Sequence, residues 1–285
     1  MNKKIMQPHT NKIEEKLSVG IIGCGWLGTA LALSLLKNDV SVLATSSQLK
    51  NVKELTLQGI SAQPLILPAA TELLEQHDVF TQQCLVIAIP PQFKQGLTDY
   101  GDKIAQLVSA AQKRGMVQRI ILLSSTAIYQ GSAGKVDENH LPHLSFEKVQ
   151  VLHQAEQAVL KFNQQSNVLR LGGLVGPNRH PGKFILANKT LSNATAPVNL
   201  IHQQDAVGLI VALLKSTSPQ GIFNGVSDTH VSKQQYYQVA ANALSFQPPI
   251  FSKEHGDEKM RVVSGTKAKH LLNYQFIYSD LLAWL

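Results

Sequence analysis

Charged residues and cysteines are both scarce in this chain of 285 residues. Only 16% of the residues are charged, and the two cysteines are Cys24 and Cys84. So few cysteines predict no disulfide framework and fit a reducing, cytoplasmic location. Neither cysteine has a metal-ligating neighbour at zinc spacing, so we predict no metal site.

Long apolar runs are also missing. No stretch approaches about 18 consecutive apolar residues, so we predict neither a transmembrane helix nor a membrane partner. Residues 1–16 are polar and charged and lack the apolar segment of a signal peptide. We interpret them as an N-terminal tail.

A concentrated basic patch is the third missing feature. The net charge is +7, which by itself would fit nucleic acid or an anionic ligand. The lysines are spread along the chain, and no Lys/Arg block alternates with aromatic residues. We therefore predict no nucleic-acid partner and favour a small ligand that carries phosphate.

Short apolar runs that alternate with amphipathic stretches are abundant over residues 17–175. This alternation is typical of βαβ units and predicts a doubly wound parallel sheet, the Rossmann form of the α/β class. Strands are expected at 17–22, 40–44, 63–67, 84–89, 119–124 and 167–171, with helices at 27–37, 48–58, 97–114 and 146–163.

A Gly- and Pro-rich stretch at 172–182 ends this rhythm. We predict a smaller mixed C-terminal lobe on the substrate side over 176–285, which could be interwoven with the first domain. Asp205 is expected to cap the helix that starts near it. The lobe's expected elements are strands at 197–201, 222–224 and 261–263 and helices at 203–214, 232–244 and 266–272.

A G-x-G-x-x-G motif follows the first expected strand directly and opens the first expected helix. It contains Gly23, Gly25, Trp26, Leu27 and Gly28. In a dinucleotide site the first glycine allows a tight turn, the second lets the pyrophosphate approach the backbone, and the third packs the helix on the strand. The strand–loop–helix context therefore predicts a dinucleotide-binding site.

The end of the second expected strand has no acidic residue. An acid there would bind the ribose 2′-hydroxyl of NAD. The sequence instead has Thr45 and Ser46, followed by Lys50, and its first acid is Glu54. Hydroxyls and a lysine suit a 2′-phosphate better, so we predict NADP in preference to NAD, although Lys50 could equally be a solvated helix residue.

Four further segments, in this order along the chain, carry a family likeness: IILLSSTAIYQG (120–131), LRLGGLVGPNRHP (169–181), LIHQQDAVGLIVALL (200–214) and FNGVSD (223–228). Together with the glycine loop they resemble the extended short-chain dehydrogenase/reductases, the superfamily of sugar-nucleotide epimerases and dehydratases. The chain looks like an atypical bacterial member. Homodimers are common in that family, and a nucleotide sugar is one substrate that the resemblance implies.

The resemblance implies roles for several other residues. Ser125 takes the place of the residue that hydrogen-bonds the substrate oxygen, and Ser124 precedes it in the same serine pair. Asn178 and Arg179 fall in the loop that closes over substrate. The family's fourth strand passes the nicotinamide ribose at positions that match Ala88, Ile89 and Pro90.

The family's catalytic pair, Tyr-x-x-x-Lys, is absent from this sequence. Counting back from Glu156, which resembles a helix glutamate of the family, places Lys148 at the tyrosine position and Leu152 at the lysine position. A leucine cannot tune a proton donor, and general acid–base catalysis needs a group of suitable pKa. Tyr129 and Lys148 are the candidate substitutes, with a structural aromatic and a solvated lysine as the alternatives.

Two functions therefore stay open. The first is an NAD(P)-dependent oxidoreductase or epimerase that acts on a carbonyl or hydroxyl substrate polarised by Ser125. The second is an inactive NADP-binding sensor or interaction protein of the same fold. A third interpretation, a dehydrogenase with an all-helical C-terminal domain, is disfavoured by the strands expected beyond residue 195.

Overall fold

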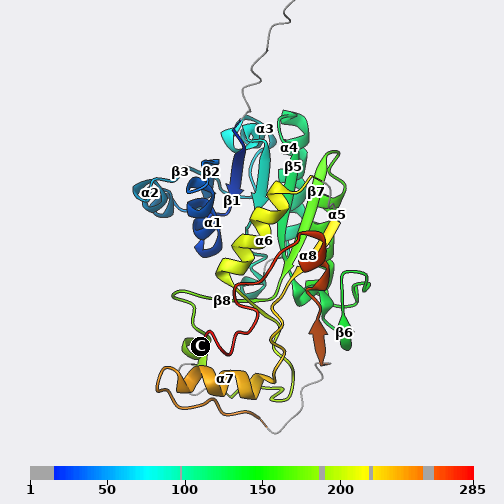
Figure 1. Cartoon of the computed structure of the whole chain (residues 1–285). Helices are drawn as coiled ribbons and strands as arrows, with labels where there is room; N and C mark the ends of the chain where they lie inside the picture. The colour runs from blue at the N-terminus through cyan, green and yellow to red at the C-terminus, as the bar shows by residue number, and fades with distance from the viewer. Residues whose placement is uncertain (1–15, 97, 186–189, 218–220, 253–259) are drawn as a thin grey trace, which may run out of the picture.

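A parallel sheet of seven strands forms the centre of the computed structural model, which describes residues 16–96, 98–185, 190–217, 221–252 and 260–285 (Figure 1). The strand order is β10-β7-β5-β4-β1-β2-β3. This order confirms the doubly wound α/β fold. The strands are β1 (Ser18–Ile22), β2 (Ser41–Ser46), β3 (Ser61–Pro64), β4 (Cys84–Ile87), β5 (Arg119–Ser125), β7 (Gln165–Leu171) and β10 (Gly221–Gly225).

The sheet is apolar on both faces because helices cover both. Along β4, Leu85 and Ile87 face one core while Cys84 and Val86 face the other. Strands that are buried on both faces have continuous apolar sequences, as observed here. The first core contains side chains of α4 (Tyr100–Arg114) and α5 (Glu147–Leu160), and the second contains those of α1 (Trp26–Leu36) and α6 (Gln203–Lys215).

Within the sheet, β2 is the neighbour of β1 along one edge and β4 is its neighbour along the other. The strand order therefore reverses its direction at β1. The carboxyl ends of β1 and β4 therefore border the crevice where a doubly wound sheet binds its ligands. α2 (Leu49–Leu57) follows β2, and the short α3 (Thr71–Gln76) follows β3. α3 is not among the helices expected from the sequence, and the third strand spans 61–64 where 63–67 was expected.

The C-terminal part contributes both to the central sheet and to smaller elements of its own. β10 pairs with β7, and α6 packs on α1. Beyond the sheet lie two small parallel pairs, β8 with β9 and β6 with β11, together with two helices; Figure 1 shows α7 and the C-terminus at the end of the molecule opposite α3. These elements are β6 (Gly134–Val136), β8 (Gly173–Val175), β9 (Leu200–His202), β11 (Arg261–Val263), α7 (Lys233–Asn242) and α8 (Thr266–Leu271).

Asp205 holds the C-terminal segment and does not cap α6, so that expectation was wrong. Its fully buried carboxylate accepts hydrogen bonds from the Tyr274 hydroxyl and from the backbone N–H groups of Ile277 and Tyr278. The cap is His202, whose Nδ1 accepts a hydrogen bond of 3.2 Å from the Gln204 N–H. A capping side chain lies before the first helical turn, and Asp205 is already inside it.

The described ranges contain neither a membrane-spanning helix nor a cluster of metal-ligating side chains. None of the helices there is both long and apolar enough to span a bilayer. No group of three or more His, Cys, Asp or Glu side chains is arranged there to hold a metal ion. The N-terminal tail that we expected at 1–16 lies outside the described residues, apart from Lys16.

Candidate functional site

The glycine loop makes a tight turn between β1 and α1. Gly23 has φ +88°, and a Cβ built on it would lie 2.6 Å from Ile89 Cγ2. Only glycine fits both the conformation and the space. The Gly23 N–H donates to the Thr45 hydroxyl at 3.3 Å, and the Cys24 N–H donates to the Thr45 carbonyl at 2.7 Å. The loop is therefore fastened to the end of β2.

Gly25 and Gly28 differ from Gly23 and from each other. No atom of the described residues lies within 4 Å of a Cβ built on Gly25, which is the N-cap of α1. A Cβ on Gly28 would lie 3.3 Å from the Gly23 carbonyl oxygen. Gly28 thus allows close packing, whereas Gly25 borders open space beside the free N–H groups of a helix start. A dinucleotide pyrophosphate fits such a cradle.

Two adjoining cavities extend from this loop. The first has a volume of about 270 Å³ and reaches the end of β2, while the second has about 330 Å³ and reaches the end of β5. Both are lined by Gly23, Gly25, Ile89, Pro90, Pro91 and Tyr100. These six shared residues form the waist of the cleft, which is the name we use below.

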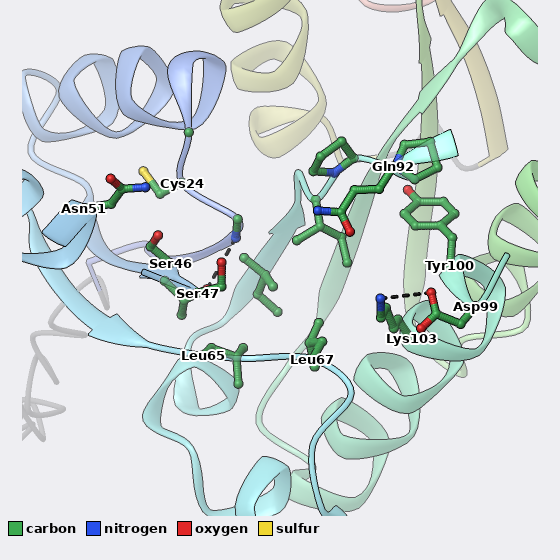
Figure 2. A pocket seen from close by; sticks show the side chains of 17 residues that line it. Cys24, Ser46, Ser47, Asn51, Leu65, Leu67, Gln92, Asp99, Tyr100 and Lys103 are labelled. Carbon is green, nitrogen blue, oxygen red and sulfur yellow. Dashed lines mark hydrogen bonds and ion pairs between the residues drawn. The ribbon is translucent and has the colours of Figure 1, made fainter. Parts of the chain in front are cut away.

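The first cavity has polar and apolar walls (Figure 2). Leu65 and Leu67 form an apolar wall, and Lys103 contributes an ammonium that pairs with Asp99 at 2.9 Å. The polar wall at the end of β2 and the start of α2 consists of Thr45, Ser46, Ser47 and Asn51. Asp99 is the one carboxylate among the described lining residues, and it is neutralised by Lys103.

Lys50 is not among the described residues that line this cavity. Its side chain is 84% exposed and lies 3.8 Å from Glu54 in an i, i+4 ion pair on the surface of α2. Lys50 is therefore placed as a solvated helix residue, which was the alternative to a contact with the 2′-phosphate. Asn51, the next residue, lines the cavity in its place, and the sequence analysis did not select it.

The second cavity contains most of the residues expected at the nicotinamide end. Ser125 ends β5 at its rim, and its hydroxyl accepts a hydrogen bond of 3.1 Å from the Ala127 N–H. Leu152 on α5 lines the same cavity at the position where the resemblance places a lysine. The other expected lining residues are Trp26, Leu27, Gly28, Ala88, Ile89, Pro90, Ser124 and Arg179.

Neither candidate acid–base group is among the described residues that line the two cavities. Lys148 is exposed in the first turn of α5. Tyr129 is 1% exposed, and its hydroxyl donates to Asn224 and accepts from Arg170, each at 2.9 Å. Burial raises the pKa of Tyr129 against the opposing effect of Arg170. Neither residue is presented to a substrate in the second cavity.

Ser124 belongs to the same buried network as Tyr129. Its hydroxyl donates to Glu156 Oε1 at 2.6 Å, although the side chain also borders the second cavity. Glu156 forms an ion pair of 2.6 Å with Arg170, and both side chains are at most 2% exposed. This network connects β5, β7, β10 and α5 beneath the cavity floor.

The loop expected to close over substrate is attached to the glycine loop. The Arg179 guanidinium lies 5.2 Å from the centre of the Trp26 ring, within the range of a cation–π contact. Arg179 lines the second cavity. Asn178 has φ +61°, which places it in a turn, and it is not among the cavity's described lining residues.

Tyr100 and Lys103 are cavity residues that the sequence analysis missed. Tyr100 is the first residue of α4 and Lys103 follows one turn later, so their positions depend on where that helix begins. We expected the helix to start at residue 97, which lies outside the described residues. The start at Tyr100 brings both side chains into the first cavity.

No family model matches the sequence. Protein YeeZ from Escherichia coli strain K12 is 31% identical over 271 residues, which cover 93% of this chain and 97% of that protein. Protein YeeZ from Escherichia coli O157:H7 matches to the same extent.

Several solved structures share the fold. MoeE5 in complex with UDP-glucose and NAD has a TM-score of 0.77 at 18% identity, covering 93% of this chain and 95% of that one. Human epimerase family protein SDR39U1 with NADPH has a TM-score of 0.74 at 17% identity, covering 94% and 97%. A functionally unknown conserved protein from Silicibacter pomeroyi has a TM-score of 0.74 at 20% identity, covering 94% and 96%.

Proposed function

Because this chain belongs to the family of Escherichia coli protein YeeZ and shares the fold of human epimerase family protein SDR39U1, we propose that it binds NADP(H) across its two adjoining cavities. The observation that carries the proposal is the waist of the cleft. Gly25 leaves open space there for a pyrophosphate, with a cavity of mixed polar and apolar walls on one side and a predominantly apolar cavity on the other. That arrangement suits adenosine in the first cavity and nicotinamide in the second.

The lining of the first cavity supports NADP over NAD. Ser46 and Asn51 can donate hydrogen bonds to a 2′-phosphate, and the acid that would select a free 2′-hydroxyl is missing from this wall. Human SDR39U1 was solved with NADPH, and MoeE5 with NAD, so the fold accommodates either cofactor.

The proposed reaction is hydride transfer at a carbonyl or hydroxyl carbon, with water supplying or taking up the accompanying proton at the substrate oxygen. The nicotinamide supplies or accepts the hydride when it is bound. In the second cavity Ser125 can donate a hydrogen bond to the substrate oxygen while its own oxygen accepts from Ala127. Leu152 and Leu171 give that end of the cavity an apolar wall, and Arg179 supplies a positive charge at its edge.

A third cavity supports a substrate that carries an anionic group, such as a nucleotide sugar. It has a volume of about 200 Å³ and includes Thr126, the residue after Ser125. Lys233 and Arg261 contribute positive charge to it, and Tyr237 contributes an aromatic wall. A diphosphate is the anion that would use these groups, and it would hold the sugar near Ser125.

A second candidate function, binding without turnover, also has a specific observation in its favour. Leu152 occupies the lysine position in the cavity, while Lys148 and Tyr129 lie elsewhere. A protein with this arrangement could sense the NADP redox state and transfer no hydride. A homodimer and a cytoplasmic location stay predictions under either function.

Calorimetric titration with NADPH, NADP⁺, NADH and NAD⁺ tests the proposal. We expect micromolar dissociation constants, about −8 kcal/mol, for the two NADP forms and weaker binding of the NAD forms. Binding followed by NADPH oxidation with a sugar nucleotide or a small carbonyl compound would support the enzyme. Binding without turnover across such a panel would favour the sensor, and no binding of any dinucleotide would contradict both.

A further inference from the structure

Tyr100 stands at the waist of the cleft, where the two cavities meet. It is 2% exposed and lines both cavities. In Figure 2 its ring projects from the start of α4 toward the segment that follows β4, with the hydroxyl oxygen at the far end. The Gly23 and Gly25 backbone forms another wall of the same waist.

The Tyr100 hydroxyl is buried and has no hydrogen-bond partner among the described residues. Glu156 is the charged group whose field reaches it. The Glu156 oxygens already accept from Ser124 and from Arg170. Burial and Glu156 both raise the pKa of Tyr100, so its hydroxyl keeps its proton at neutral pH and can donate it in a hydrogen bond.

A buried polar group without a partner destabilises a folded protein. Such groups in native structures call for an explanation, and a ligand that supplies the missing acceptor is one. At the waist the acceptor would come from the middle of a dinucleotide, because its two ends extend into the two cavities. That middle part consists of the pyrophosphate and the adjoining nicotinamide ribose.

We propose that the Tyr100 hydroxyl donates a hydrogen bond to the central part of a bound NADP(H), at the pyrophosphate or the nicotinamide ribose. The inference rests on the proposed function and adds a binding residue on α4. The hydroxyl is retained for the ligand at a cost to the ligand-free fold. Removing it therefore has opposite effects on stability and on binding.

Tyr100→Phe tests this by deleting the hydroxyl and keeping the ring. We expect the thermal midpoint of the ligand-free protein to rise by about 1–3 °C, because an unsatisfied buried group is lost. We expect the dissociation constants for NADP⁺ and NADPH to rise about tenfold, as for one lost hydrogen bond. If the hydroxyl had only a structural role, its loss would not both raise the thermal midpoint and weaken dinucleotide binding.

Tyr236→Phe is the matched control. The Tyr236 hydroxyl is also buried without a partner among the described residues, but it lies on α7 in the C-terminal lobe and lines neither cavity of the cleft as described. We expect the same direction of change in thermal midpoint and no change in dinucleotide affinity. Weakened binding in this control would show that the affinity loss is nonspecific and would overturn the inference.

Two fragments of the cofactor locate the contact. 2′-Phospho-ADP-ribose contains the pyrophosphate and the second ribose, whereas adenosine 2′-monophosphate has neither and occupies the adenosine side alone. Tyr100→Phe should weaken the first about tenfold and leave the second unchanged. Equal weakening of both fragments, or wild-type affinity of the variant for NADP⁺, would overturn the inference. Failure of the wild-type protein to bind any dinucleotide would instead overturn the proposed function.

Discussion

Trp26 Nε1 donates a hydrogen bond of 3.0 Å to the carbonyl oxygen of Pro177, a residue 151 positions further along the chain. The Trp26 carbonyl in turn accepts from Gln203 Nε2 at 3.0 Å. The glycine loop is thereby attached both to the 176–185 loop and to the start of α6. In the proposed binding mode, a dinucleotide at the glycine loop is therefore connected through Trp26 to the edge of the second cavity.

Trp26→Phe should weaken this connection. The substitution keeps an aromatic ring, although a smaller one, but the hydrogen bond to Pro177 is lost, at a cost of about 0.5–1.5 kcal/mol. We expect the dissociation constant for NADPH to rise by less than about tenfold and the 176–185 loop to become more sensitive to limited proteolysis. Calorimetry and a proteolysis time course measure the two effects.

Trp284 supplies the control for Trp26, because these are the two tryptophans of the chain. NADPH should quench tryptophan fluorescence in wild type and in Trp284→Phe, and the quenching should disappear in Trp26→Phe. Quenching that survives in Trp26→Phe would show that the dinucleotide does not bind at the glycine loop.

Gly25→Val should abolish dinucleotide binding and leave the fold intact. The backbone of Gly25 has φ −97°, which a valine can adopt, and a Cβ there meets no atom of the described residues within 4 Å. The added side chain would occupy the space of the pyrophosphate. We expect affinity for NADPH to fall at least about a hundredfold, measured by calorimetry, with a thermal midpoint close to that of wild type.

Gly28→Val is the contrasting variant in the same loop. Its Cβ would already lie 3.3 Å from the Gly23 carbonyl, so the packing of α1 on the loop must change. We expect a lower free energy of unfolding by about 1–3 kcal/mol as well as weaker binding. If Gly25→Val bound NADPH with wild-type affinity, the glycine loop would not be part of the binding site.

The parallel sheet could be predicted from the sequence because its strands are apolar on both faces and are separated by amphipathic helices. The strand 261–263 is observed at the expected residues, and Gly115 ends α4 in the left-handed conformation that favours glycine. α3 was missed because six residues are too few to show a helical period, and β6 because its sequence, Gly134-Lys135-Val136, contains no apolar run.

The candidate site was predictable where it depends on local backbone and not where it depends on packing. The spacing of Gly23, Gly25 and Gly28 is a local property, and these residues line the cavities as expected. Tyr100 enters the site only through the packing of α4 beside the loop after β4. Nothing in the residues around it indicates that contact.

Ser125→Ala and Ser124→Ala should separate chemistry from stability. Ser125 faces the second cavity, so its loss should lower turnover at least about tenfold and leave dinucleotide affinity unchanged. Ser124 donates to buried Glu156, so its loss should lower the free energy of unfolding by about 1–3 kcal/mol. Denaturant unfolding and steady-state kinetics measure the two effects, and unchanged turnover in Ser125→Ala would exclude it from the mechanism.

Glu156 and Arg170 should be strongly coupled in stability. Arg170→Met leaves the Glu156 carboxylate buried without its ion-pair partner, which costs about 3–5 kcal/mol. Glu156→Gln likewise leaves the Arg170 guanidinium buried without its ion-pair partner. The double variant should lose less than the sum of the two single losses, as measured by denaturant unfolding. Additive losses would show that the pair contributes no coupling.

His202 should make the fold sensitive to mild acid. The side chain is 1% exposed, and its ring centre lies 3.8 Å from that of Tyr278. Burial lowers the pKa of His202 below its ordinary value of 6.5, against an opposing effect of Asp205. Below pH 6.5 the unfolded chain therefore binds a proton that the folded protein does not, so stability is complete above that pH and falls as the pH decreases.

Protonation of His202 would also remove the Nδ1 acceptor that caps α6. His202→Asn keeps a capping oxygen and cannot titrate. It should be less stable than wild type at pH 7.5, because ring contacts are lost, but should lose less stability between pH 7 and pH 5. The pKa of His180 is also lowered by burial, so the stability of the variant should still decrease somewhat as the pH falls. Denaturant unfolding across this range measures the difference, and parallel pH profiles for the two proteins would show that His202 is not the titrating group.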